Sequence, residues 1–593
     1  MKNKEMCWDL EALYSSLELW DEDFSKLEAM AQKFAAYKGR LAESPALFRE
    51  AIEVSDEFER LSEKLYVYAH LRSDQDTTVG SNRARVDRIC SKLAELSALE
   101  AWFEPEVMAI PDDRMKELLS SEDLAFYRRS IEELLREKKH VLSESEERLF
   151  GQLSDVLGTS NDLFSTLNDT DLRFGRVRGE DGKMQTLTHG SYRRFLESSD
   201  RTVRRSAFRK LYTTYEKFRN TFAVTLDSTV KRHVVSAKIR KFDSALQQAL
   251  HPDNIPEAVY LNLISTVHEH LDGLFDYFKL RGEVLELDKV NMYDLHCPLV
   301  NECRTEYDFA SGSKLVQEAL MPLGEDYAVN LRRAWSERWI DVPERPGKRS
   351  GAYSSGCYDS YPYLLLNYQN TFDDVFTLAH ELGHSMHSFY SRANQHYHYA
   401  DYEIFVAEVA STTNELLLSR YLLENTGDHA MRAYILAHLA DEIRGTIYRQ
   451  TMFAEFELGI HRAAWEGEVL TADFLDENYF KLNAEYHGPF VETDPLIALE
   501  WSRIPHFHYN FYVYKYATGM SAAIRLSEKI LSGDPAAVEA YLNFLKSGGS
   551  KDVLDIMRDA GVDLATPEPV AAALKFFKTV VGELRKELQF LKK

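Results

Sequence analysis

Two histidines and a glutamate form the pattern His380-Glu381-x-x-His384. On a helix, side chains four residues apart share one face, so both imidazoles could bind one metal ion. Glu381 directly follows the first histidine, where its carboxylate could hold and deprotonate a water molecule at the metal. A motif this short also arises by chance, and the alternative is a surface helix with two ordinary histidines. The surrounding sequence has to decide between them.

The residues around the motif predict a helix without reference to the histidines. Thr371 and Asp374 occupy the positions of a capping box, in which each residue caps the other's backbone N–H. Apolar residues then give the segment a buried side. They are Val375, Phe376, Leu378, Ala379 and Leu382.

A catalytic zinc usually has three protein ligands and one open position for water, so a third ligand is needed. His387 shares the helical face, but it lies about 10 Å from His380 along the axis. One rigid helix cannot easily wrap His380, His384 and His387 around one tetrahedral ion. Tyr390 occupies the position that holds the third histidine in metzincins.

Glu408 would complete a His₂Glu ligand set from a second helix. This helix is expected to be capped by Asp401 and to run to about Glu424. Glu415 lies on the same face as Glu408, so it could orient one of the ligands from behind. The alternative for Glu408 is a solvated carboxylate on a helix surface.

Peptide hydrolysis also needs a donor for the oxyanion that forms when water attacks the carbonyl. Residues 504–519 form the part of the chain that is densest in histidine and aromatic residues. The alternative for this segment is an aromatic strip of the core, and spacing alone leaves both open. The candidate donors are His506, His508, Tyr509, Tyr512 and Tyr516.

Composition sets further bounds. The 593 residues suffice for roughly two to four domains. A net charge of −24 argues against nucleic-acid partners and against docking on an anionic membrane. No apolar run is long enough to span a bilayer or to act as a signal peptide. The five cysteines are scattered, which favours a reduced, cytoplasmic protein. His296, Cys297 and Cys303 fit no common zinc-knuckle spacing.

The order of the elements predicts two domains. Residues 1–195 are expected to form a helical domain that ends in a β-hairpin around Gly179–Gly182, and residues 196–593 a catalytic domain. Residues 340–369 are rich in glycine and proline. Near the end of this stretch, residues 363–368 are expected to form a short apolar strand. This strand either pairs with an extended peptide substrate or is an ordinary buried strand.

Several segments together resemble a known family. They are residues 380–387, residues 405–411 with Asn414 and Glu415, residues 347–356, residues 504–519, and Trp8-Asp9-Leu10. The chain is similar over nearly its whole length to the zinc oligopeptidases that include thimet oligopeptidase and oligoendopeptidase F. The oligoendopeptidase F branch is the closer match.

The resemblance implies a mainly α, prolate fold of many helices with a deep central channel and small β elements beside the site. It implies one Zn²⁺ per chain, with His380, His384 and Glu408 as ligands and Glu381 as general base. A histidine and a tyrosine near the C-terminus would act on the tetrahedral intermediate, and His508 departs from the branch, where an aromatic residue is usual. The expected reaction is cleavage of internal bonds in unstructured peptides of roughly 5–20 residues.

Two other functions fit some of the same residues. The first is a deformylase-like or aminopeptidase-like zinc hydrolase, which a peptide with a blocked N-terminus would distinguish. The second is a helical scaffold that binds peptides without cleaving them, which zinc content measured together with peptide turnover would distinguish. The sequence leaves cleavage preference and oligomeric state open.

Overall fold

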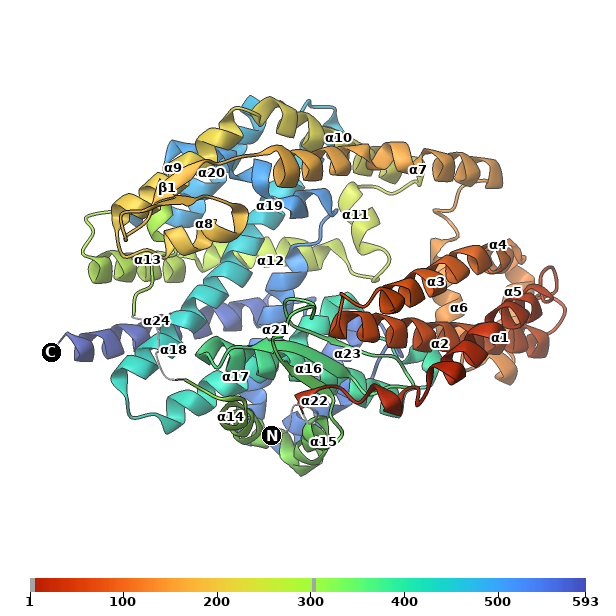
Figure 1. The fold of residues 1–593 in the computed structure, drawn as a ribbon. Helices are drawn as coiled ribbons and strands as arrows, with labels where there is room; N and C mark the ends of the chain where they lie inside the picture. Colours follow the sequence, from red (N-terminus) through yellow and green to blue (C-terminus); the bar gives the residue numbers. More distant parts are fainter. Residues whose placement is uncertain (1–5, 301–305, 593) are drawn as a thin grey trace. The chain divides into compact units, whose positions relative to one another are not determined.

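The computed structural model describes residues 6–300 and 306–592 (Figure 1). Helices contain 72% of the residues and strands 4%, which confirms the predicted mainly α class. The chain divides into two compact units, each built from three separate ranges. Unit 1 comprises Met1–Lys139, Arg304–Tyr421 and Leu526–Gly561, and unit 2 comprises His140–Cys303, Leu422–Arg525 and Val562–Lys593.

Unit 1 is an array of helices with one small sheet. Its helices are α1 Leu17–Ala35, α2 Pro45–Gln75, α3 Gly80–Leu96, α4 Phe103–Ala109, α5 Asp112–Leu119, α6 Arg128–Glu137, α14 Phe309–Ala319, α15 Gly324–Ser336, α16 Phe372–Asn394, α17 Ile404–Asn425, α22 Pro535–Lys546 and α23 Val553–Asp559. The apolar residues spaced at three to four along α1 and α2 do form a core, in which Leu27 and Leu65 are fully buried. Helix α17 begins at Ile404, so Asp401 lies three residues outside it and does not occupy the expected cap position.

The sheet of unit 1 has three strands in the order β4-β6-β5. These are β4 Ile340–Pro343, β5 Tyr353–Ser355 and β6 Tyr363–Tyr368. Strand β6 pairs with β4 in parallel and with β5 in antiparallel, so both of its edges are occupied. The idea that residues 363–368 offer an edge to substrate is therefore wrong. The edge on the side away from β4 belongs to β5, which comes from the glycine-rich segment.

Unit 2 is also mainly helical. Its helices are α7 Glu144–Ser165, α8 His189–Leu196, α9 Arg201–Glu216, α10 Arg219–Ile239, α11 Ala245–Leu250, α12 Glu257–Glu269, α13 Leu271–Leu285, α18 His429–Ile443, α19 Arg449–Glu466, α20 Ala472–His487 and α24 Glu568–Leu591. Strands β1 Arg176–Arg178 and β2 Met184–Thr186 form the predicted antiparallel hairpin, and β3 Val290–Asn291 pairs in parallel with β7 Val491–Glu492. Two helices contain unit boundaries, α17 between residues 421 and 422 and α21, Tyr514–Leu531, between residues 525 and 526.

The expected domain boundary at residue 195 stays a prediction, because the two units reflect density of contacts and not independent folding. Across the part of the chain that the structure describes, no helix combines the length and the apolar character that a membrane span requires.

Candidate metal centre

Helix α16 begins as its sequence predicts. The N–H of Asp374 donates to Thr371 Oγ1 at 3.2 Å, and the N–H of Thr371 donates to Asp374 Oδ2 at 2.8 Å. This reciprocal capping box satisfies two backbone donors at the start of the helix. Val375 and Leu378 are buried below it, so the helix that carries the histidines is fixed at its start and along its apolar side.

A glycine lets α17 approach α16 closely. A Cβ at Gly383 would lie 2.5 Å from the Cα of Ser411, which leaves no room for any other residue. The side chain of Asn414 donates to the carbonyl of Ala379 at 3.1 Å and joins the two helices a turn away. The sequence analysis missed this role of Gly383, although a glycine inside a helical pattern is a signal for close packing.

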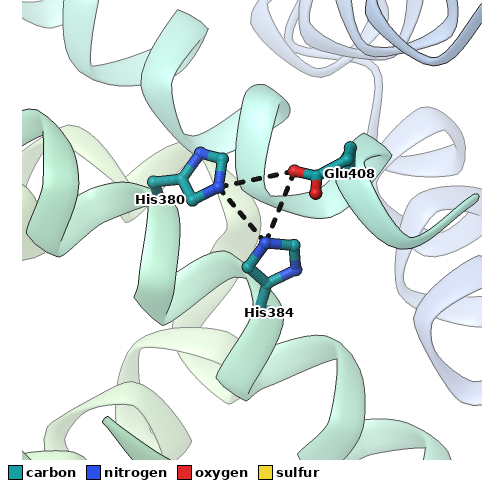
Figure 2. A group of neighbouring side chains, drawn as sticks. All are labelled: His380, His384 and Glu408. Carbon is teal, nitrogen blue, oxygen red and sulfur yellow. Dashed lines mark hydrogen bonds and ion pairs between the residues drawn. The ribbon is translucent and has the colours of Figure 1, made fainter. Parts of the chain in front are cut away.

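The two helices bring His380, His384 and Glu408 together (Figure 2). The two Nε2 atoms lie 3.2 Å apart, and Glu408 Oε2 lies 3.4 Å from each of them. Ligand atoms at about 2.0–2.1 Å from a tetrahedral zinc lie roughly 3.3–3.4 Å from one another. The three atoms therefore have the spacing of one face of a zinc tetrahedron, and the donor set of two imidazoles and a carboxylate also suits zinc.

The second carboxylate of α17 lies behind the first histidine. The Nδ1 atom of His380 is 3.2 Å from Glu415 Oε1, a contact that directs the other ring nitrogen toward His384 and Glu408. Burial lowers the pKa of His380, but hydrogen bonds with Glu408 and Glu415 outweigh it and raise this pKa to about 10. Hydrogen bonds from His380 and His384 lower the pKa of Glu408. The two carboxylates of α17 thus favour a positive charge beside the histidines.

Glu381 lies next to the same group and is 8% exposed. Burial raises the pKa of its carboxyl group, although the nearby His380 and His384 oppose the shift. The backbone of Ser354 in strand β5 lies near enough to this carboxyl group to lower its pKa in part. A carboxylate with a raised pKa is a better proton acceptor at neutral pH, so the position suits a general base.

His387 is a core residue and not part of this group. It is 1% exposed, its ring stacks on Tyr402 at a centroid distance of 3.6 Å, and burial lowers its pKa to about 3. Tyr390 donates its hydroxyl hydrogen to Asp326 at 2.8 Å. Among the described residues, His380, His384 and Glu408 are the one group with metal-ligand spacing, and Cys303 lies outside those residues.

The five candidate donors for the oxyanion lie in unit 2. Four of them form one group of side chains, and His508 lies apart from it. His506 is surrounded by three phenol rings, with the hydroxyl of Tyr516 at 3.4 Å from its Nε2. The other two rings belong to Tyr509 and Tyr512. His508 instead packs on Phe164 and its Nδ1 lies 2.9 Å from Thr229 Oγ1, in the interior of unit 2.

The turn after these histidines has an unusual backbone. Asn510 and Phe511 both have positive φ, at 52° and 60°, and neither is glycine. Such residues cost free energy and persist where the surroundings hold them. The N–H of Phe511 donates to Glu457 Oε1 at 2.6 Å, and Glu457 is fully buried in α19. Sequence analysis did not find Glu457, because its partner lies 54 residues away.

The comparisons with known proteins all lead to one group of peptidases, and the relatives match nearly the whole chain. A model of "Peptidase family M3" matches residues 194–576, and a model of "Oligopeptidase F" matches residues 106–174. The chain is 45% identical to oligopeptidase PepF of Bacillus subtilis, covering 99% of this chain and 88% of the relative. It is 42% identical to group B oligopeptidase PepB of Streptococcus agalactiae, covering 97% and 96%. The crystal structure of oligoendopeptidase-F from Enterococcus faecium matches with a TM-score of 0.74 at 38% identity, over 96% of this chain and 99% of that one.

Proposed function

The chain belongs to peptidase family M3 and is a metalloendopeptidase of the oligopeptidase type, and from this premise we propose a zinc-dependent mechanism. His380, His384 and Glu408 would hold one zinc ion, and the substrates would be short unstructured peptides. The observation that carries the proposal is the triangle of ligand atoms with edges of 3.2, 3.4 and 3.4 Å.

Zinc in this position would act as a Lewis acid and would lower the pKa of water to near neutrality. Glu381, which is buried beside the two histidines, would accept the proton of the attacking water and pass it to the leaving amine. Glu415 holds His380 in the required tautomer through Nδ1. His506 with Tyr512 and Tyr516 forms the donor group for the oxyanion, while His508 serves the packing of unit 2.

The division into a helical domain of residues 1–195 and a catalytic domain of residues 196–593 is part of the same proposal. The start of the longer family match at residue 194 supports it. A cytoplasmic location and a single zinc ion per chain are likewise proposals, supported by the scattered cysteines and by the single cluster of metal ligands among the described residues.

Peptide length sets the substrate range in this proposal. The edge of β5 lies beside Glu381 and could pair with an extended peptide backbone without regard to side chains. An enclosed channel would admit unstructured peptides of roughly 5–20 residues and exclude folded chains. The test is a digest of one long unstructured protein beside its own short fragments. Equal rates per bond on both would rule out the channel.

The base is tested with Glu381→Gln, which keeps the shape and removes the proton acceptor. We expect about one zinc per chain and a loss of turnover of at least about 10²–10⁴-fold, the usual contribution of a positioned base. Asp373→Asn on the exposed first turn of α16 is the matched control and should keep activity. Near-normal turnover by zinc-loaded Glu381→Gln would refute this role.

A further inference from the structure

Unit 2 contains a cavity of about 240 Å³ that the proposed mechanism does not use. Its walls come from α8, α9, α13, α19, α20, residues 292–296, the π-turn η9, Arg444–Tyr448, and the 3₁₀ segment η11, Pro495–Arg503. One part of the wall is apolar and includes Leu274, Phe278 and Ile497. Another part carries the guanidinium groups of Arg444, Arg449 and Arg503. A wall of this kind in a chain with a net charge of −24 calls for an explanation.

Two of these arginines share a single carboxylate. Arg449 Nη2 lies 2.8 Å and Arg503 Nη1 3.2 Å from the same oxygen of Glu500, Oε1. The other oxygen of Glu500 accepts the hydroxyl hydrogen of Tyr479 at 2.7 Å. One negative charge therefore faces two positive charges at this wall.

The same imbalance recurs at Arg444. Its Nε lies 3.0 Å from Asp441 Oδ1, and the other oxygen of Asp441 lies 3.5 Å from Nη1 of the fully buried Arg281. Again two guanidinium groups share one carboxylate. The side chains of Arg281 and Arg444 are buried, whereas those of Arg449 and Arg503 keep 32% and 22% of their surface exposed. An anion in the cavity would compensate the excess of positive charge, which is most costly at the buried groups.

A π-helix turn directs these side chains to one wall. Residues Arg444–Tyr448 form the turn, and the N–H of Arg449 bonds to the carbonyl of Arg444. In a regular α-helix the residue five positions on is turned about 140° away from the first, whereas a π-turn brings it closer to the same side. Arg444, Tyr448 and Arg449 consequently all reach the cavity. π-Turns are rare in proteins, and those that occur often lie at functional sites.

Free hydrogen-bonding capacity remains at the cavity wall. Within the described parts of the chain, Nε of Arg503 and Nδ1 of His296 are buried and have no hydrogen-bond partner. Both residues line the cavity. Buried polar atoms in native structures nearly always have partners, so these two point to a polar group that is absent from the protein itself.

We propose that this cavity is a second ligand site, which binds the free C-terminal carboxylate of a short peptide with an apolar last residue. The guanidinium groups take the carboxylate, in the forked geometry that arginine offers. The apolar wall takes the side chain. The proposal rests on the proposed function only in naming a peptide as the source of the carboxylate, and it needs no zinc.

Binding is measured by calorimetry on full-length protein stripped of metal, which cannot cleave the probe. The probes are acetyl-Leu-Leu with a free carboxylate, the same compound as the C-terminal amide, and inorganic phosphate. We expect the free acid to bind at least about tenfold more tightly than the amide, because charge-assisted hydrogen bonds are lost in the amide. Equal binding of acid and amide would overturn the proposal. Tighter binding of phosphate would overturn the peptide and leave an inorganic-anion site.

The site is located with Arg449→Gln, which leaves Glu500 paired with Arg503 and Tyr479. Affinity for the free acid should fall at least about tenfold. Arg462→Gln is the matched control, since Arg462 is exposed on the same helix and lies outside the cavity, and it should bind normally.

A measurement on the unaltered protein guards against a variant that misfolds. Crystals of the full chain soaked with acetyl-Leu-4-iodophenylalanine should show the anomalous signal of iodine against the apolar wall. Iodine at another place, or unchanged affinity in a folded Arg449→Gln protein, would overturn the assignment. Loss of turnover in Glu381→Gln with intact binding here would separate this proposal from the zinc mechanism.

Discussion

The metal ligands and the His506–Tyr516 segment are built in different ways. His380, His384 and Glu408 project from two long helices, α16 and α17, whose backbones satisfy their own hydrogen bonds. The segment instead runs through the short 3₁₀ turn Pro505–His508 and two residues with positive φ before α21 begins. The first arrangement depends on helical spacing and on one close contact between helices. The second depends on a buried carboxyl group in a distant part of the sequence.

Removal of a ligand should give the largest effect. Glu408→Ala should weaken zinc binding by more than the roughly 10–100-fold that loss of a supporting partner costs. His387→Ala is the control, because His387 is packed in the core, and it should keep zinc while the protein becomes less stable. Metal analysis after dialysis measures both. Loss of zinc from His387→Ala and its retention by Glu408→Ala would mean that the third ligand was assigned wrongly.

The close contact between the helices gives the next effect. Alanine at position 383 gains about 1 kcal/mol in helix propensity. The new Cβ would, however, lie 2.5 Å from the backbone of Ser411, so α17 must move away and carry Glu408 with it. We expect Gly383→Ala to weaken zinc binding about 10–100-fold, measured by competition with a chelator. Gly459→Ala in α19 meets no atom within 4 Å and should leave zinc binding unchanged.

Changes that disturb the His506–Tyr516 segment should lower turnover and leave the zinc content unchanged. Glu457→Ala removes the acceptor for the N–H of Phe511 and frees a turn that is held in a strained conformation. We expect kcat to fall about tenfold, because small misplacements of catalytic groups are costly, with zinc content unchanged. Glu457→Gln keeps an acceptor oxygen and should recover most of the rate. A fall in zinc content for Glu457→Ala would erase the difference between the two regions.

The helical region was largely predictable from sequence. The capping box at Thr371, the i, i+4 histidines and the shared face of Glu408 and Glu415 are all local patterns, and each led to the observed geometry. The role of Gly383 was not predicted, because it depends on where another helix crosses.

For residues 504–519 in unit 2, the sequence identified the candidate donors but not how their side chains are arranged. The pattern could not separate His506 from His508, since their directions follow from the tight turn and its contacts. Glu457 and the pairing of β5 with β6 depend on residues distant in sequence or on a register that residue types do not specify. Contacts that follow from helical spacing, including that of Glu415 with His380, could be predicted, whereas contacts that depend on an irregular turn or on strand register could not.

The smallest expected effect concerns the protonation of Glu457. Burial raises the pKa of its carboxyl group from 4.5 to about 8. Between these values the folded protein keeps a proton that the unfolded chain releases, so stability falls as pH rises from about 4.5 to about 8. One proton contributes at most about 1.4 kcal/mol per pH unit. Glu457→Gln cannot ionise, and it should remove this part of the slope.

Urea unfolding at about pH 5.5 and about pH 7.5 measures the slope, as the difference between wild type and variant. Glu466→Gln, exposed on the same helix, controls for the loss of a glutamate and should leave the slope as in the wild type. A wild-type slope retained in Glu457→Gln would show that the carboxyl group is already ionised in the folded protein. The turn at Asn510 and Phe511 would then be held by a negative charge on Glu457 and not by a neutral carboxyl group.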